Sequence, residues 1–91
     1  MTVQVELFGI PRQRVGVPRV EVPVSSHAVR LGDILLDVAR QFPAFADECL
    51  IGDYVRAGIA VNLDGNRFVA DPETMVTAGQ SLLIMSADAG G

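Results

Sequence analysis

Every second side chain is apolar in two segments near the start of the chain, residues 2–8 and 17–24, and most of the side chains between them are polar. Alternation with a period of two is the pattern of a strand with one buried face. The second segment contains Pro18 and Pro23. Because proline cannot donate to a strand ladder, we expect this strand at the edge of a sheet. The two strands would form a hairpin, and we expect the segment between them, residues 9–16, to be a loop.

The next regular pattern has the period of a helix. Apolar side chains recur at helical spacing along one face of residues 31–42. Asp33 in the first turn and Arg40 in the last suit the helix dipole, and Pro43 closes the helix. Arg30, which precedes the helix, is a poor N-cap. A helix of this length spans roughly 18 Å, about enough to cross a small sheet.

Strand patterns return in the second half of the chain. Further strands are expected in residues 59–63, 66–69 and 82–85. Asp64-Gly65 is a hairpin signal between the first two of these. The segment 44–58 gives a mixed signal, with a short helical turn followed by loop residues. Met75 and Val76 are expected to cap the core.

The expected order is strand, strand, helix, strand, short strand, strand. A hairpin, a crossing helix and returning strands would form one mixed sheet of four to five strands, with one main helix packed on one face. The first and last strands would lie side by side at its centre. This is the α+β arrangement called the β-grasp. We expect the folded domain to span residues 1–86 and a flexible tail to span residues 87–91.

Composition narrows the possible functions. The 91 residues have a formal net charge of -4. This argues against nucleic-acid binding, which depends on Lys and Arg neutralising phosphates, but leaves room for a basic protein partner. The longest apolar run, residues 82–85, is too short to span a membrane, and the first residues show no signal-peptide pattern. With Cys49 as the single cysteine, we expect no internal disulfide and a cytoplasmic protein.

The chain ends in Gly90 and Gly91, a few residues after the last strand. Glycine has no Cβ and adopts both halves of φ space, so this end could thread a channel that any side chain would block. Together with Ala89, we expect it to enter a partner's active site and present the Gly91 carboxylate there. A carboxylate is inert towards thiols and amines, whereas an acyl-adenylate made by a partner holding ATP is a good electrophile.

Several short motifs, in this order and spacing, resemble the MoaD/ThiS family of ubiquitin-like sulfur carriers. The matching segments are Leu7-Phe8-Gly9, Leu31-Gly32-Asp33-Ile34-Leu35-Leu36, Val61-Asn62-Leu63-Asp64-Gly65 and Ala89-Gly90-Gly91. The chain departs from the family pattern at Arg30 and in residues 78–80 and 86–88, where that family often has Thr, Asp-Gly-Asp and Pro-Pro-Val. Without the two prolines the tail is less stiff. These departures bear on which activating enzyme the protein fits, and not on the carrier role itself.

The resemblance implies a sulfur carrier. An adenylyltransferase of the ubiquitin-activating type would use ATP to adenylate Gly91, and a persulfide sulfur donor would turn the adenylate into a thiocarboxylate. The sulfur would be delivered at the large subunit of a synthase, with molybdopterin synthesis favoured over thiazole or cysteine synthesis. The carrier itself would bind no cofactor and supply no catalytic side chain. The alternatives are a protein modifier joined to other proteins through Gly91, and a plain β-grasp interaction module.

A docking surface is expected beside the tail. Phe8, Leu83 and Met85 are predicted on the sheet face away from the helix, where the neighbouring first and last strands would bring them together as an exposed apolar patch. Arg12 and Arg14 would lie at its rim. The competing interpretation is that the segment after the helix, or a dimer partner, covers these side chains.

The remaining polar residues give weaker signals. His27 has no serine or cysteine partner suggested by spacing, and Asp33 and Asp37 are better explained as a solvated helix face than as a metal site. A loose acidic group that could contact a basic partner consists of Asp47, Glu48 and Asp53. The sequence has no cysteine pair for zinc, no glycine-rich phosphate loop and no triad pattern. We therefore expect no metal site and no enzyme acting alone.

Overall fold

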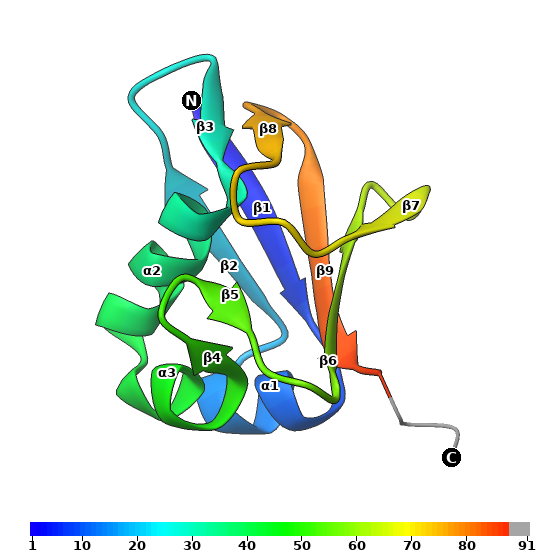
Figure 1. Ribbon diagram of the computed structural model, residues 1–91. Coiled ribbons are helices and arrows are strands. Elements are labelled where there is room, and N and C mark those ends of the chain that lie inside the picture. Colours follow the sequence, from blue (N-terminus) through cyan, green and yellow to red (C-terminus); the bar gives the residue numbers. More distant parts are fainter. Residues whose placement is uncertain (88–91) are drawn as a thin grey trace.

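The structure, a computed structural model, describes residues 1–87 (Figure 1). Within this part of the chain the helices are α1 (Gly9–Val15), α2 (Leu31–Gln41) and α3 (Pro43–Cys49). The strands are β1 (Thr2–Leu7), β2 (Arg19–Pro23), β3 (Ala28–Arg30), β4 (Leu50–Ile51), β5 (Tyr54–Val55), β6 (Ile59–Leu63), β7 (Arg67–Val69), β8 (Met75–Thr77) and β9 (Ser81–Ser86). Among these described residues, no helix has the length and apolar character needed to cross a membrane.

Five of the strands form one mixed sheet in the order β2-β1-β9-β6-β7 (Figure 1). The central strands β1 and β9 run parallel, with Val5 opposite Leu82. The β1–β2, β6–β9 and β6–β7 pairs are antiparallel. The expected mixed sheet and its central pair of first and last strands are confirmed. Strand β2 lies at the edge, as Pro18 and Pro23 predict.

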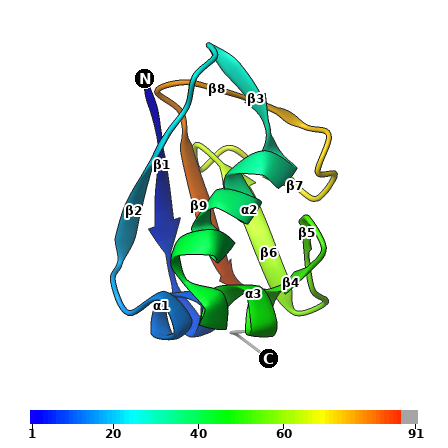
Figure 2. The ribbon, with the colours of Figure 1, turned by 90° about the vertical axis from the view of Figure 1, so that its left-hand side faces the viewer.

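Helix α2 packs on one face of the sheet and closes the core (Figure 2). In β1 every second side chain faces this helix, and Val3, Val5 and Leu7 are at most 1% exposed. The buried side chains of α2 are Leu31, Ile34, Leu35 and Val38. Full burial of one such side chain stabilises the fold by about 1.5–3 kcal/mol. The apolar faces predicted from the strand alternation and from the helical period thus pack together in one core, and the predicted helix is confirmed.

The segment between β1 and β2 is helix α1, so the expectation of a loop is wrong. Pro11 lies in the first turn of α1, where its missing N–H is not needed, and its ring is buried. The helix ends at Gly16, which has a φ of 88° and whose N–H donates to the Arg12 carbonyl at 2.8 Å. Residues that look like strand breakers in the sequence therefore begin and end a short helix.

Two small two-stranded sheets are also absent from the sequence prediction. After α3, strands β4 and β5 pair as a hairpin within the segment of mixed signal. Strand β3, in the segment between β2 and α2, pairs with β8. Strands this short contain too few residues to show a period. Val76 is buried as expected, but Met75 is 52% exposed, so only Val76 caps the core.

The turn before β8 holds the start of α2. Arg30 makes no side-chain cap bond, as expected for a poor N-cap. Instead, the Leu31 N–H donates to the Thr74 carbonyl at 2.8 Å and the Gly32 N–H donates to the Pro72 carbonyl at 3.0 Å. These two bonds satisfy N–H groups that a helix start otherwise leaves without a partner.

The Arg30 side chain joins three separate segments. Its guanidinium donates to Asp33 at 2.8 Å, to Asp53 at 2.9 Å and also to Glu73. Hydrogen bonds to Glu73 and Asp53 raise the pKa of Arg30 above its ordinary value, because they favour the charged form. The departure from the family pattern at this position therefore has a structural role: it ties α2 to the β4–β5 turn and to the turn before β8.

Candidate docking surface at the end of strand β9

Strand β9 leads towards the end of the chain from the centre of the sheet, with β1 on one side and β6 on the other (Figure 1). Hydrogen bonds hold the last residue of β9 and the residue that follows it. The Ala87 N–H donates to the Gly58 carbonyl at 2.7 Å, and Ser86 Oγ accepts a hydrogen bond from the Ile10 N–H at 3.0 Å. The backbone is thus held up to Ala87, the first residue of the predicted tail. The predicted site residues that lie outside the described residues are Ala89, Gly90 and Gly91.

Gly9 brings the start of α1 against the end of β9. Its φ of 61° is in the left-handed region that favours glycine. A Cβ at this position would lie 2.7 Å from Ser86 Oγ and 3.3 Å from Ser86 Cβ. Both the backbone conformation and the close approach therefore require glycine, and the contact fixes α1 beside the last residue of β9.

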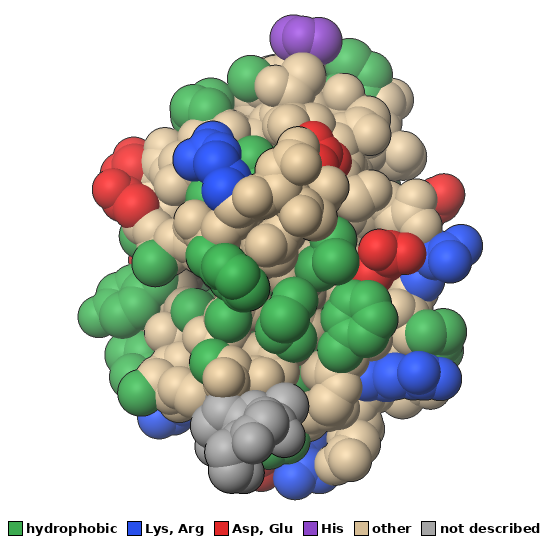
Figure 3. Space-filling view, turned by 90° about the vertical axis from the view of Figure 1, so that its right-hand side faces the viewer, with side chains coloured by type: hydrophobic (Ala, Val, Ile, Leu, Met, Phe, Trp, Pro, Cys, Tyr) green, Lys and Arg blue, Asp and Glu red, His purple; other side chains and the backbone are tan. Residues whose placement is uncertain are grey.

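Apolar side chains gather on the sheet face away from α2 (Figure 3). We name this the outer-face surface and define it as Phe8, Ala60, Phe68, Leu83 and Met85. Met85 of β9 lies opposite Ala60 of β6, and Leu83 lies opposite Asn62, the next outward-facing residue of β6. Phe68 of β7 lies opposite the same asparagine. The surface therefore extends over three adjacent strands beside the point where β9 ends.

A buried polar atom lies at the centre of the outer-face surface. Asn62 is 8% exposed and lies between Leu83 and Phe68 in the strand register. Its Oδ1 has no hydrogen-bond donor within residues 1–87. A buried acceptor without a partner costs about 1–3 kcal/mol. The domain on its own therefore retains this asparagine at a cost in stability.

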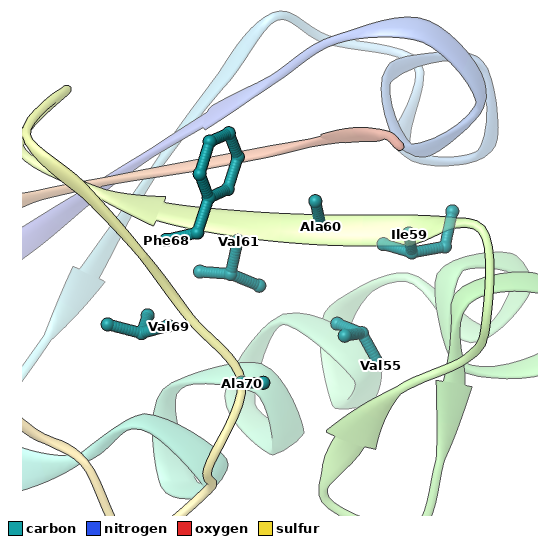
Figure 4. Close-up of a pocket in the computed structure, with 7 residues that line it drawn as sticks. All are labelled: Val55, Ile59, Ala60, Val61, Phe68, Val69 and Ala70. Carbon is teal, nitrogen blue, oxygen red and sulfur yellow. The ribbon is translucent and has the colours of Figure 1, made fainter. Parts of the chain in front are cut away.

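A recess opens next to this surface, beside strands β6 and β7 and the end of β5 (Figure 4). It has a volume of about 280 Å³ and is lined by Val55, Ile59, Ala60, Val61, Phe68, Val69 and Ala70. In Figure 4, Phe68 points to the opposite side of β6 from Val55 and Val69. All lining side chains are apolar, so the recess suits an apolar group of a partner better than a charged ligand.

Comparison with known proteins finds this architecture in solved structures. No protein-family model matches the chain, and no curated protein sequence matches it. SAMP1 from Haloferax volcanii matches with a TM-score of 0.80 and 20% identity over 100% of both chains. A candidate molybdopterin converting factor subunit 1 from Pyrococcus furiosus has a TM-score of 0.76 and 20% identity, over 94% of this chain and 97% of that chain. The BexX/CysO complex of Amycolatopsis orientalis contains a match with a TM-score of 0.73 and 23% identity, over 98% and 99%.

The protein is a β-grasp domain. This confirms the fold class expected from the sequence, an α+β domain with one main helix on a mixed sheet. At sequence identities of 20% to 23%, the similarity to these solved structures shows a shared fold only.

The apolar docking residues predicted from sequence lie on one face of the β-grasp domain. Leu83 and Met85 are half-buried in the sheet, and Phe8 is 44% exposed. The Phe8 N–H donates to the Ile84 carbonyl at 2.9 Å, which places Phe8 beside β9. The structure thus brings the three residues together as expected, with less exposure at the two strand positions. Their role in docking stays a prediction.

The most exposed side chain of the outer-face surface is one that sequence reasoning missed. Phe68 is 67% exposed. Residues 66–69 were expected to form a short return strand, but a strand of this length does not reveal which face is buried. The available signal is the neighbour Val69, which belongs to the core. Because successive side chains point to opposite faces, Phe68 must point outward.

The two arginines expected at the rim lie on helix α1. Arg12 is exposed. The Arg14 Nε lies 3.7 Å from the Glu48 Oε1 of α3, so Arg14 is directed at the helical layer. Arg14 is therefore turned away from the expected rim, and a rim position for Arg12 stays a prediction.

The loose acidic group expected from sequence is divided by the fold. Glu48 pairs with Arg14, and Asp53 pairs with Arg30. Two of its three members are therefore held in separate ion pairs, and Asp47 is the third. Contact with a basic partner through the whole group is not favoured by this arrangement.

The other polar candidates also have ordinary structural surroundings. Asp33 pairs with Arg30, and Asp37 pairs with Arg40. His27 is exposed in the loop before β3. In residues 1–87, no group of three or more His, Cys, Asp and Glu side chains is placed to hold a metal ion.

Cys49 is fully buried at the end of α3. Burial raises the pKa of the Cys49 thiol, because a thiolate is disfavoured away from water. Since the thiolate is the reactive form, this thiol is held unreactive. Cys49 therefore acts as a small buried apolar residue of the core.

Proposed function

We propose that this β-grasp domain is a sulfur carrier that is loaded at Gly91. An adenylyltransferase of the ubiquitin-activating type would adenylate the Gly91 carboxylate, and the loaded product would be a C-terminal thiocarboxylate. The proposal rests on one observation: the central strand β9 ends at Ser86 beside the exposed apolar outer-face surface, and Gly90 and Gly91 follow within five residues of sequence. A partner bound on that surface would have the acyl group within reach.

The arrangement of the domain suits presentation of a chain end. Strand β9 is bonded on both sides, and the Ala87 N–H extends this support by one residue. Contiguous exposed apolar area marks interaction sites on proteins, and here it lies on the same sheet. The solved structures with this fold include one named as a small archaeal modifier protein, one named as a candidate converting-factor subunit and one from a two-protein complex. These names support a role in which the domain works with a larger partner.

The chemistry proceeds in three steps. The Gly91 carboxylate attacks the α-phosphate of ATP, which releases pyrophosphate and forms the acyl-adenylate. The outer sulfur of a persulfide attacks the acyl carbon, and AMP leaves, so that an acyl disulfide forms. A thiol reductant then cleaves the S–S bond and leaves one sulfur on Gly91 as the thiocarboxylate. In all three steps the domain docks and presents its end, while the partners supply the reacting groups and the ATP.

The acceptor that we favour is the large subunit of a molybdopterin-type synthase, ahead of a thiazole or cysteine synthase. The similarity to the candidate molybdopterin converting factor subunit 1 supports this order. Incubation of the loaded carrier with each type of synthase would decide between them, because only the true acceptor would consume the thiocarboxylate.

A second candidate function is protein modification through the same activated Gly91. The similarity to SAMP1, a small archaeal modifier protein, favours it. All seven basic residues are arginines, so the chain offers no lysine to accept another copy of itself. Conjugates would therefore carry single copies at each modified lysine. Higher-mass adducts in cell lysate that disappear on deletion of Gly91 would establish this function, whereas full function without Gly90 and Gly91 would establish a plain interaction module.

The adenylation step is testable by exchange of labelled pyrophosphate into ATP. The domain is incubated with each ubiquitin-activating-type adenylyltransferase encoded in the same genome, and exchange is measured with and without Gly91. We expect exchange with the unaltered domain and with Ser26→Ala, a control in the loop before β3, and none after deletion of Gly91. Exchange that persists without Gly91 would contradict the proposal. The proposal takes Gly91 as the last residue of the mature chain, which an intact mass verifies.

A further inference from the structure

We infer that Asn62 is the residue by which the activating partner recognises the outer-face surface. The partner donates a hydrogen bond from a neutral N–H or O–H group to Asn62 Oδ1. The inference rests on the proposed function, because it concerns the same partner. It assigns a specificity-determining residue to a surface that is otherwise apolar.

The first argument is the unmet hydrogen bond itself. Asn62 is 8% exposed, and its Oδ1 has no donor within residues 1–87. Buried polar atoms in native proteins are nearly always bonded, so an exception requires an explanation. The explanation here is the position of Asn62, between Leu83 and Phe68 in the middle of the outer-face surface. A protein bound on this surface would be placed to supply the missing donor.

The second argument is that the described fold gives Asn62 no hydrogen bond that would require an amide. The position is an outward-facing one within strand β6, where β-branched and aromatic residues are the usual choice. An amide at this site raises the specificity of binding. Because the oxygen is already buried and unpaired in the free domain, only a partner that supplies a donor gains this hydrogen bond on binding.

The third argument concerns the kind of donor. The cross-strand neighbours of Asn62 are the apolar Leu83 and Phe68. A charged donor would lose its water there without a carboxylate to pair with, which is costly. Two carboxylates near this site are already engaged: Glu6, opposite Leu83 on β1, lies 3.8 Å from Arg19. Asp64, two residues after Asn62, accepts hydrogen bonds from the Ser81 N–H and the Gln80 amide. A neutral donor, such as a backbone N–H flanked by apolar side chains, therefore fits this site best.

Access to the oxygen requires one side chain to move. Phe68 lies directly opposite Asn62 on the edge strand β7 and is 67% exposed, so little packing holds it. Rotation of an interface side chain on binding is common. Rotation of Phe68 would make room beside Asn62, and the apolar recess next to it could receive an apolar group of the partner.

The test uses Asn62→Leu, which removes the acceptor but keeps the size and branching of the side chain. Replacing an unpaired buried polar group by an apolar group of the same shape is neutral or stabilising. We expect the thermal midpoint of Asn62→Leu to stay equal or to rise by about 4 °C. In pyrophosphate exchange with the adenylyltransferase, we expect its KM to rise about three- to tenfold with kcat unchanged, the signature of a lost binding contact. Asn62→Ala, a second variant without the acceptor, should also raise the KM.

The matched control is Asn66→Leu, the same change at an exposed amide of the same hairpin. We expect it to leave the KM unchanged. A KM for Asn62→Leu equal to that of the unaltered domain would overturn the inference. A fall in the thermal midpoint of Asn62→Leu would overturn it as well, because Asn62 would then serve the fold. An unaltered domain that supports no exchange with any adenylyltransferase would instead overturn the proposed function, and this inference with it.

Discussion

Replacing Phe68 by serine is expected to separate docking from folding. Phe68 is 67% exposed, so about a third of its side chain is buried in the free domain. Full burial of a phenylalanine contributes about 1.5–3 kcal/mol. The substitution should therefore lower the free energy of unfolding by only about 0.5–1 kcal/mol, which leaves the domain folded at room temperature.

The effect on partner binding should be larger than the effect on stability. An aromatic side chain that becomes buried at an interface can contribute about 2 kcal/mol or more to binding. If the outer-face surface is the docking site, Phe68→Ser should raise the KM of the adenylyltransferase for the domain about 30-fold. The loss would arise in binding, because Phe68 takes no part in the chemistry at Gly91.

The matched control is Ile51→Ser. Ile51 is 48% exposed and lies on β4, on the helical side of the domain (Figure 1). Urea denaturation followed by circular dichroism measures the stability of both variants, and pyrophosphate exchange measures both KM values. We expect similar small losses of stability and a raised KM for Phe68→Ser alone. Equal KM values for the two variants would refute the assignment of the docking face.

Three further predictions test other parts of the structure. Phe8→Asp should abolish pyrophosphate exchange but keep the circular dichroism spectrum, since Phe8 is 44% exposed; normal exchange would remove Phe8 from the docking surface. Gly9→Ala should lower the free energy of unfolding by more than the roughly 1–2 kcal/mol of left-handed strain, because its Cβ would meet Ser86. The control is Gly58→Ala, because Gly58 has a φ of 91° but no atom lies within 4 Å of an added Cβ, so this variant should show the backbone strain alone. Equal losses of stability in the two variants would contradict the close packing at Gly9. As the pH rises above about 8.5, the unaltered domain should lose stability relative to Cys49→Ala, because the Cys49 thiol has a raised pKa in the folded state and therefore loses its proton first in the unfolded chain. Urea denaturation at a series of pH values measures this, and parallel pH profiles of the two proteins would count against it.

The long periodic elements of the fold could be predicted from the sequence. Strands β1, β2, β6 and β9 and helix α2 each contain enough residues to show a period, and their apolar faces meet in one core. The pairing of β1 with β9 also followed, since the order of elements leaves the first and last strands at the centre of the sheet.

The shorter elements could not be predicted, because contacts distant in sequence decide them. Helix α1 depends on Gly9 fitting against Ser86, and the start of α2 depends on carbonyls of residues 72 and 74. Strand pairs such as β3–β8 and β4–β5 have at most three residues on each side. The burial of Asn62 depends on the register of β6 with both neighbouring strands, which alternation within β6 alone does not reveal.

The central claim is that the end of this β-grasp domain is activated and loaded with sulfur. The most direct test is the intact mass of the domain after incubation with the adenylyltransferase, ATP, a persulfide donor and a thiol reductant, followed by fragmentation of the C-terminal peptide. The account predicts the mass increase of one oxygen-for-sulfur exchange, located at Gly91 and dependent on ATP. An unchanged mass with every adenylyltransferase of the genome, or an added sulfur located at Cys49, would contradict it.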